Sequence, residues 1–332
     1  MTNDRQVRTA RETRRRIKRA AAQLAAAGSV LLLPLTLLPF VGWHYPFELL
    51  SHFQMQYFFA ALACAAVLAL LRRWRWCVVS LASLVLAAAA IGPYQGAGQA
   101  AHADADVIDT GPSVRVLLAN VRFSNREHDR VLELVRNADA DVLVFQEVNE
   151  RWKSALTPIT AAYPYVAGKS REDSFGTLVY SRLPILDQGT LPHDAAGRSS
   201  LRLVIDVQGT PVSVVCTHPK TPLIEGSFTL RNQQIDRVTE LVATLPRPLV
   251  LVGDLNTTMW SPWFRRLCDR ADLVSVRGGV GVLGSWPAAL PGFLRIPIDH
   301  VLVSPDVTVG GCRLGDAVGS DHLPLIVDLQ MP

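Results

Sequence analysis

Three long runs without a charged residue, at residues 20–41, 53–71 and 76–94, constrain the fold of this chain more than any other feature. A helix rises about 1.5 Å per residue and the hydrocarbon core of a bilayer is about 30 Å thick, so each run is about long enough to cross it. Helices of soluble proteins carry a polar face, which these runs lack. The sequence therefore predicts a three-helix transmembrane anchor over residues 20–94 rather than part of a soluble bundle.

The positions of basic residues predict how this anchor is oriented. A basic arm, residues 1–19, precedes the first run, and the loop at residues 72–75 also carries arginines, whereas the loop at residues 42–52 has no Lys or Arg. Because Lys and Arg near span ends are retained in the cytoplasm, the arm is expected there and everything after residue 94 outside the cytoplasm. A cleaved secretory signal explains the first run less well, since a signal core is only about 7 to 15 residues long.

Beyond the anchor, residues 95–113 are rich in Gly, Ala and Asp without apolar periodicity, which is typical of a flexible linker. From residue 114 to residue 332, short β-branched runs alternate with helical stretches. This pattern predicts a mixed α/β domain in which sheets pack on each other with helices outside. Strands are expected at 114–120, 142–147, 177–181, 200–207, 211–218, 248–254, 298–304 and 325–329, and helices at 128–137 and 228–244.

The net charge is a poor guide to the partner of this domain. The whole chain carries a net charge of +4, which by itself would favour a nucleic-acid partner. The basic excess lies in the anchor and its arm, however, and the remainder has more acidic than basic residues. The electrostatic field of the larger domain therefore gives no reason to expect DNA binding.

Polar residues follow several predicted strands, where a side chain can be held rigidly and still reach a cleft. The segments are LLANVRF with Asn120, VFQEV with Glu147, VCTHPK with His218, VGDLNT with Asp254 and Asn256, PIDHVLVS with Asp299, and GSDHLPL with Ser320, Asp321 and His322. Singly, each has a structural explanation, because an asparagine often forms a turn and VGDLNT could cap a helix that begins near Ser261. Their joint occurrence favours a catalytic site.

The order of these segments resembles the endonuclease/exonuclease/phosphatase superfamily, which includes deoxyribonuclease I, abasic-site endonucleases, neutral sphingomyelinases and inositol polyphosphate 5-phosphatases. The resemblance rests on N, QE, TH, GDLN, IDH and SDH in sequence, with GSWP at residues 284–287 ahead of IDH. It extends from residue 114 to about residue 329. The resemblance implies a four-layered α/β sandwich of the deoxyribonuclease I type and metal-assisted hydrolysis of a phosphoester.

The resemblance also implies a metal site. Glu147 matches the principal metal ligand of the family, with Asn120 beside it, and Asp321 resembles a further metal ligand or a group that orients a histidine. A hard cation such as Mg²⁺ prefers oxygen ligands and keeps several waters, so a few protein oxygens and a substrate phosphate are enough. Mg²⁺ is the expected cofactor, with Mn²⁺ as a possible substitute.

The catalytic groups are implied in the same way. His322 matches the general base that activates water, and Asp299 matches the carboxylate that orients it and stabilises the imidazolium. Asp254 matches a second carboxylate near the attacking water or the metal. Asn256 and His218 match donors to the phosphate oxygens, on which negative charge grows during the reaction.

Two arginines affect the predictions for the substrate pocket and for the number of metal ions. Arg231, on the helix that follows His218, is expected either to line the substrate pocket or to lie on a solvated helix face. Arg122 stands where abasic-site endonucleases carry an aspartate that can supplement the metal site, which favours a single metal.

The whole sequence thus predicts a membrane-anchored, extracytoplasmic, Mg²⁺-dependent phosphoesterase acting on a phosphodiester or phosphomonoester. Its partners would be the phosphoester substrate, either nucleic acid or a lipid head group, and membrane lipids, and no obligate protein partner is inferred. A nuclease and a phospholipid or sphingolipid phosphodiesterase both stay open. A catalytically silent membrane interaction module is the alternative from another class. A serine hydrolase using Ser320 is disfavoured, because the sequence has no G-x-S-x-G segment.

Overall fold

The computed structural model of the protein describes residues 2–95, 111–193 and 197–332. The chain divides into two compact units, which we call the helical unit (Met1–Gly92) and the sandwich unit (Pro93–Pro332). Most of the predicted linker, residues 96–110, lies outside the described residues.

The helical unit contains the three predicted apolar helices. Its elements are α1 (Thr2–Val41), α2 (Phe47–Leu50), η1 (Ser51–Phe53), α3 (Gln54–Leu70) and α4 (Trp74–Ile91), and the turn η2 (Gly92–Tyr94) follows it. Three segments, Arg5–Val41, Phe47–Leu70 and Trp74–Tyr94, are long and apolar enough to cross a membrane. The basic arm is not a separate element, because α1 runs through it without a break.

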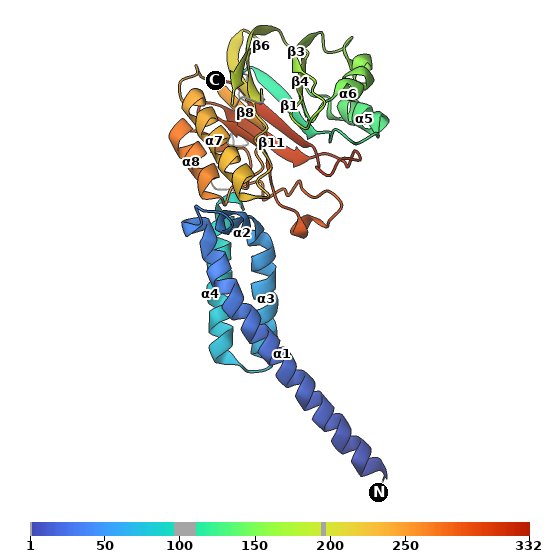
Figure 1. Ribbon diagram of the computed structural model, residues 1–332, viewed down its shortest axis with the longest axis vertical. Helices are drawn as coiled ribbons and strands as arrows, with labels where there is room; N and C mark the ends of the chain where they lie inside the picture. Colours follow the sequence, from blue (N-terminus) through green and yellow to red (C-terminus); the bar gives the residue numbers. More distant parts are fainter. Residues whose placement is uncertain (1, 96–110, 194–196) are drawn as a thin grey trace. The chain divides into compact units, whose positions relative to one another are not determined.

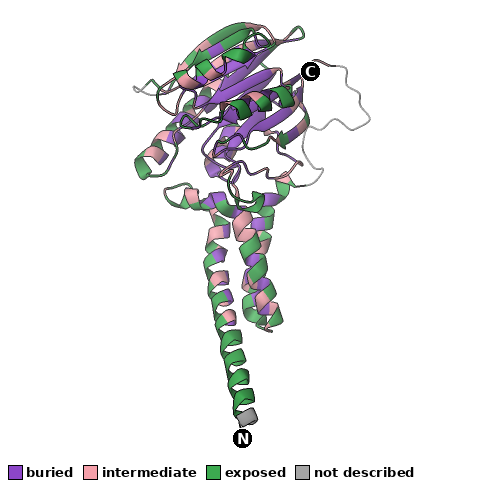
Figure 2. Ribbon diagram, turned by 90° about the vertical axis from the view of Figure 1, so that its right-hand side faces the viewer, coloured by how far each residue is buried: buried purple, intermediate pink, exposed green. Residues whose placement is uncertain are grey.

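Small side chains hold these helices together. Ser29 in α1 and Ser80 in α4 share a buried hydrogen bond of 2.6 Å between their hydroxyl groups, and Ala25, Ala65, Leu68 and Cys77 form a buried cluster between the helices. Many large apolar side chains face outward, among them Leu24, Leu70 and Val85, and Figure 2 shows how much of this unit is exposed compared with the strands of the sandwich unit. Outward apolar and inward small residues are the pattern of helices that pack within lipid.

The sandwich unit has two six-stranded sheets. One sheet has the order β11 (Thr308–Leu314), β12 (Leu325–Gln330), β1 (Ser113–Asn120), β2 (Val142–Gln146), β4 (Thr177–Ser181) and β3 (Tyr165–Lys169). The other has the order β5 (Ile185–Pro192), β6 (Ser199–Val207), β7 (Thr210–Cys216), β8 (Leu249–Asp254), β10 (Asp299–Val303) and β9 (Val274–Ser275).

Helices cover the outer face of each sheet. They are α5 (His128–Ala138), α6 (Glu150–Ala155) and η3 (Thr157–Ile159) on one side, and α7 (Glu225–Val242) and α8 (Pro262–Ala271) on the other, with η4 (Gly292–Leu294) in a loop. Figure 1 shows α7 and α8 on one side of the strands and α5 and α6 on the opposite side. The expected four-layered α/β sandwich is therefore confirmed.

Strand β2 shows why its sequence is apolar throughout. Successive side chains of a strand point to opposite faces of the sheet. Val142 and Val144 accordingly lie in the core between the two sheets, whereas Leu143 and Phe145 lie in the core beneath α5 and α6. Because β2 is buried on both faces, its residues 142–145 are all apolar.

Strand directions bring the polar strand ends together. β1 and β2 are parallel with Asn120 opposite Gln146, and β7 and β8 are parallel with Cys216 opposite Val252. β10 runs antiparallel to β8, which places its first residue, Asp299, opposite Asp254. The carboxyl ends of β1, β2, β7 and β8, the amino end of β10 and the loop before β12 thus supply the residues of one site.

Candidate active site

Gln146 joins the two sheets at this edge. Its side-chain nitrogen donates to the carbonyl oxygen of Thr217 at 2.8 Å, and its side-chain oxygen accepts from the backbone N–H of Asp254 at 2.8 Å. The side chain is fully buried, so both hydrogen bonds are shielded from water. Sequence reasoning gave Gln146 no role of its own, although a polar residue closing the apolar strand VLVFQ was a usable signal.

Gly253 allows β8 to lie close both to β7 and to the side chain of Gln146. A Cβ atom at Gly253 would lie 1.8 Å from the carbonyl oxygen of Thr217 and 2.7 Å from the side-chain nitrogen of Gln146, and the residue has a φ of +155°. Neither backbone oxygen nor buried amide can yield by that much. The glycine therefore fixes the separation of β7 and β8 beside the site.

Two carboxylates flank the imidazole of His322. Its Nδ1 lies 2.9 Å from Asp299 Oδ2, and its Nε2 lies 3.7 Å from Asp254 Oδ2. The ring of His218 approaches the same Asp254 oxygen, with 3.7 Å between Nδ1 and Oδ2. Within the described residues, Asp254, Asp299 and His322 form a buried group whose ligand atoms lie within 4.8 Å of one another, a geometry that could hold a metal ion.

The pKa values of these groups are strongly perturbed. Burial raises the pKa of Asp254 to about 6, although the nearby histidines oppose that rise. Burial by itself would lower the pKa of His322, but the charges of Asp299 and Asp254 outweigh it and raise the value to about 10. Burial also opposes ionisation of Asp299, yet the attraction of His322 keeps the Asp299 pKa below its usual range. Asp299 and His322 therefore form an ion pair at neutral pH.

Glu147 and Asp254 converge on the side chain of Asn120. Asn120 Nδ2 donates to Glu147 Oε1 at 3.1 Å and to Asp254 Oδ2 at 3.3 Å, and the backbone N–H of Phe123 donates to Glu147 Oε2 at 3.2 Å. Asn120 Oδ1 accepts instead from the backbone N–H of Arg122 at 3.0 Å. The structure thus brings together the predicted ligands Asn120 and Glu147, with the amide nitrogen turned toward the carboxylates.

Ser320, Asp321 and His322 of the SDH segment contact different partners. The Ser320 hydroxyl donates to the carbonyl oxygen of Asn120 at 2.7 Å and accepts from the backbone N–H of His322 at 3.1 Å. Because the ring of His322 faces Asp299 and Asp254, a serine relay through Ser320 has no support. The carboxylate of Asp321 lies 3.3 Å from the indole nitrogen of Trp286 and 3.7 Å from Arg122. Its predicted metal or histidine-orienting role stays a prediction.

Asn256 is held at the edge of the site by its neighbours. Its side-chain nitrogen donates to the carbonyl oxygen of Pro219 at 3.0 Å, and its backbone N–H donates to Asp254 Oδ1 at 2.9 Å. The guanidinium of Arg231 donates to the carbonyl oxygen of Asn256 at 2.9 Å, and Arg231 is fully buried. This geometry favours Arg231 as a support for Asn256 over a residue that touches substrate.

His300, the residue that follows Asp299, forms a buried pair with Arg277. His300 Nε2 lies 2.9 Å from the carbonyl oxygen of Thr257, and His300 Nδ1 lies 3.4 Å from the guanidinium of Arg277. Burial lowers the pKa of His300 to about 3, and the charge of Arg277 acts in the same direction. The neutral ring therefore donates from Nε2 and accepts at Nδ1, and it ties the segment after β8 to Arg277.

Aromatic and basic side chains line the approach to His218. The ring of Phe175 meets that of His218 edge-on at 5.8 Å between centroids. Arg198 and Lys220 lie over the Phe175 ring, at 5.1 and 5.4 Å from its centroid. Arg198 and Lys220 thus place positive charge beside Phe175, which contacts His218.

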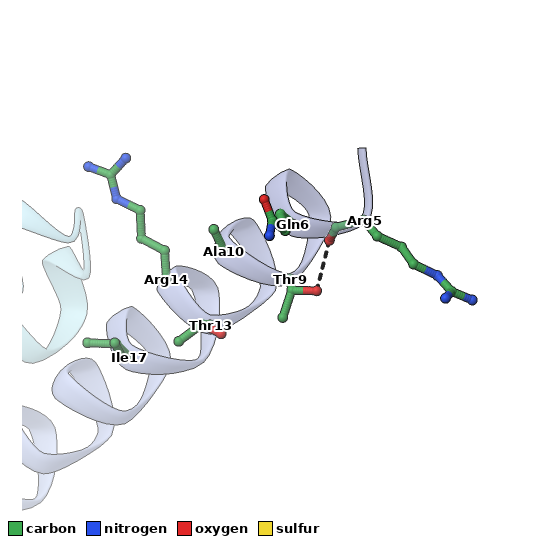
Figure 3. A pocket seen from close by; sticks show the side chains of 7 residues that line it. All are labelled: Arg5, Gln6, Thr9, Ala10, Thr13, Arg14 and Ile17. Carbon is green, nitrogen blue, oxygen red and sulfur yellow. Dashed lines mark hydrogen bonds between the residues drawn. The ribbon is translucent and has the colours of Figure 1, made fainter. Parts of the chain in front are cut away.

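A hollow on the surface of α1 is unrelated to this chemistry. Figure 3 shows its lining side chains, which are Arg5, Gln6, Thr9, Ala10, Thr13, Arg14 and Ile17. All seven come from one exposed helix, so the hollow is an open strip of helix surface. We assign it no function.

Buried carboxylates and imidazoles that face one another at the edge of an α/β sandwich are typical of a hydrolytic enzyme. The model of the Endonuclease/Exonuclease/phosphatase family matches residues 117–322, and the chain belongs to this family. Members of the family are hydrolases that act on phosphoester bonds and generally depend on a divalent metal. A search of curated proteins found no match.

Solved structures share the sandwich. An endonuclease/exonuclease/phosphatase from Beutenbergia cavernae DSM 12333 is 21% identical with a TM-score of 0.54, covering 66% of this chain and 72% of that one. The corresponding protein from Bacteroides vulgatus is 20% identical with a TM-score of 0.56, covering 66% and 99%. D. rerio TDP2, complexed with single strand DNA product, is 15% identical with a TM-score of 0.57, covering 66% and 99%. At these identities the likeness concerns the fold.

Proposed function

We propose that the protein is a membrane-anchored phosphoesterase that depends on Mg²⁺ or Mn²⁺ and hydrolyses a phosphodiester with His322 as the general base. The single observation that carries this proposal is the convergence of Glu147, Asp254, Asp299 and His322 from four separate parts of the chain. Groups so placed can bind a cation, position water and accept its proton.

The donor atoms suit a hard divalent cation. Two carboxylates, Glu147 and Asp254, lie against one amide nitrogen, and the repulsion between two carboxylates is what a bound cation offsets. We propose Glu147 as the principal ligand, with Asp321 as a further candidate. Asn120 would supply oxygen only by turning its amide group away from Arg122. Bound there, the cation would polarise the phosphoryl oxygens and lower the pKa of His322 toward neutrality.

The chain's own groups account for the remaining steps. Asp299 holds the tautomer of His322 that leaves Nε2 facing Asp254, and Nε2 takes a proton from water located by Asp254. His218 and the side chain of Asn256 are the proposed donors to phosphoryl oxygens. The water hydroxyl adds to phosphorus, one P–O ester bond breaks, and the departing oxygen takes the proton. The products are a phosphomonoester and an alcohol.

Metal dependence is the test of this proposal. The purified full chain should hydrolyse bis-p-nitrophenyl phosphate with Mg²⁺, lose that activity with EDTA and regain it when Mg²⁺ is restored. Glu147→Gln should raise the Mg²⁺ concentration needed for half-maximal rate by about 10- to 100-fold. Absence of hydrolysis by the wild-type chain with Mg²⁺ or Mn²⁺ would favour a catalytically silent interaction module.

We further propose the arrangement of the chain about the membrane. Residues 1–19 form a basic cytoplasmic arm, residues 20–94 the anchor, residues 95–113 the linker and residues 114–332 the catalytic domain. The arginines before the first span and between the second and third spans support a cytoplasmic N-terminus and an extracytoplasmic catalytic domain. Membrane lipids and the phosphoester are the partners, and no obligate protein partner is needed.

A further inference from the structure

Two loops border the proposed active site. The loop after His218, residues 219–224, is tied to the site by the hydrogen bond from Asn256 to Pro219. The loop between β9 and β10 is tied to it at Asp321, whose carboxylate accepts from Trp286 and whose carbonyl oxygen accepts from the backbone N–H of Ala288 at 2.8 Å. Both loops are therefore next to the reacting groups.

Each loop exposes large apolar side chains. Leu223 is 75% exposed and Ile224 66%, and in the second loop Leu290, Phe293 and Leu294 are 39%, 52% and 38% exposed. We call these five residues the apolar rim. Single exposed apolar residues are common, but several on two loops beside one site indicate a surface that is covered in use.

The second loop is built to hold its apolar residues outward. The guanidinium of Arg295 donates to the carbonyl oxygens of Leu290, at 2.6 Å, and Ala288, at 3.1 Å. The turn η4 (Gly292–Leu294) lies within this closed loop. Hydrogen bonds from the Arg295 side chain to backbone carbonyl oxygens thus help to give the loop its shape, and Figure 1 shows it projecting from the body of the sandwich unit.

Few residues of the chain separate this loop from the residue that pairs with the end of the third apolar segment. That segment ends at Tyr94, and the next residue, Gln95, pairs with Val280 inside the sandwich unit. Val280 precedes Leu290 by ten residues, which at about 3.8 Å between consecutive Cα atoms is at most about 38 Å along the chain. Lys220 and Arg198 add positive charge on the neighbouring side of the site.

We propose that the apolar rim dips into the outer part of the bilayer that anchors the chain, and that the substrate is the phosphodiester of an anionic glycerophospholipid in that bilayer. The inference rests on the proposed function, since it names the substrate of the same site. Apolar insertion combined with attraction of cations to anionic lipid is how proteins bind membrane interfaces. A nucleic-acid backbone would instead require several cations along a groove, where this rim presents Leu, Ile and Phe.

Hydrolysis in a bilayer tests the substrate. The full chain is reconstituted in nanodiscs containing phosphatidylglycerol and phosphatidylcholine, and phospholipid hydrolysis is compared with hydrolysis of bis-p-nitrophenyl phosphate and of single-stranded DNA. The double variants Leu223→Ser with Ile224→Ser, and Phe293→Ser with Leu294→Ser, should lose at least tenfold more activity on phosphatidylglycerol than on the soluble ester. Leu186→Ser, which alters a 58% exposed leucine in β5, is the matched control. It should leave the ratio of activity on phosphatidylglycerol to activity on the soluble ester unchanged.

A second measurement reads insertion without activity. In nanodiscs of brominated phosphatidylcholine and phosphatidylglycerol, Phe293→Trp should add a quenched fluorescence component to that of the wild-type chain, whereas Leu186→Trp should add an unquenched one. Equal loss on both substrates, an unquenched Phe293→Trp, or faster hydrolysis of DNA than of any phospholipid would overturn the inference and leave the proposed function intact. Absence of hydrolysis of every substrate, bis-p-nitrophenyl phosphate included, would overturn the proposed function itself.

Discussion

His322 is the residue whose surroundings matter most for the proposed chemistry. Asp299 and Asp254 hold its pKa at about 10 in the absence of a cation, which would leave it protonated at neutral pH. A general base must be neutral to accept a proton. His322 can therefore act as the base only if a positive charge near Asp254 offsets the negative charge of that carboxylate and lowers the His322 pKa. This requirement links the basicity of His322 to the proposed metal.

Replacing Asp299 tests that link. Asp299→Asn removes the charge that most raises the His322 pKa, so the base limb of the pH–rate profile should move to lower pH. The imidazolium also loses its stabilising partner, and kcat should fall by about 10²-fold. The measurement is kcat/KM with Mg²⁺ from about pH 5 to about pH 10. A profile identical to that of the wild-type chain would mean that Asp299 does not act through His322.

His300 predicts how the sandwich unit responds to acid. Its pKa of about 3 in the folded state lies below the unfolded value of about 6.5, so its contribution to stability is present above pH 6.5 and is lost as pH falls toward 3. The free energy of unfolding should therefore fall with falling pH in this window, by at most about 1.4 kcal/mol per pH unit from this residue.

The variant His300→Gln separates this effect from other titrations. Glutamine can donate to Thr257 and accept from Arg277 without titrating, so the fall in stability should be shallower below pH 6.5 than in the wild-type chain. Denaturant unfolding of both chains at several pH values is the measurement. Parallel curves would show that His300 is not the group responsible.

The sequence allowed the polar strand ends to be predicted, but not the residues that hold them in place. Asn120, Glu147, Asp254, Asp299 and His322 stand next to apolar runs, where the local pattern reveals them. The role of Gln146 depends on partners 71 and 108 residues away, and Arg277 reaches His300 across 23 residues. Such contacts leave no local periodicity, so only the assembled fold shows them.

Among the elements, the strands that sequence reasoning missed share one position. β3 and β11 are the edges of one sheet, and β5 and β9 are the edges of the other. An edge strand is covered less than a central one and needs no continuous apolar run. β3 is accordingly exposed except at Ala167, β5 has only exposed and half-buried residues, and both contain glycine, whereas central strands such as β2 and β8 are buried throughout.

The close approach of β7 and β8 gives a prediction for one element. Gly253→Ala places a Cβ atom 1.8 Å from the carbonyl oxygen of Thr217, so the strands must separate and Asp254 must move. We expect a loss of several kcal/mol in the free energy of unfolding, with little activity remaining.

Gly226→Ala is the matched control for this change. A Cβ atom at Gly226, near the start of α7, meets nothing within 4 Å, so stability should stay the same or rise by up to about 1 kcal/mol. Denaturant unfolding of both variants is the measurement. Equal stability of the two variants would show that β7 and β8 can separate at little cost.

For the whole molecule, the central prediction concerns the side of the membrane on which the chemistry takes place. A reporter enzyme that is active only outside the cytoplasm, fused after Pro332, should be active if the three apolar segments cross the membrane from a cytoplasmic N-terminus. Replacing Arg72, Arg73 and Arg75 by neutral residues should reduce that activity. Activity of a cytoplasmic reporter at the same position would contradict the three crossings.

The account as a whole depends on His322 as the group that activates water. The most direct measurement is the rate of bis-p-nitrophenyl phosphate hydrolysis at saturating Mg²⁺ by the purified wild-type chain and by His322→Ala, with denaturant unfolding to verify that both are folded. The account predicts that kcat falls by about 10²- to 10⁴-fold in the variant. A folded His322→Ala chain that keeps the wild-type rate would contradict it.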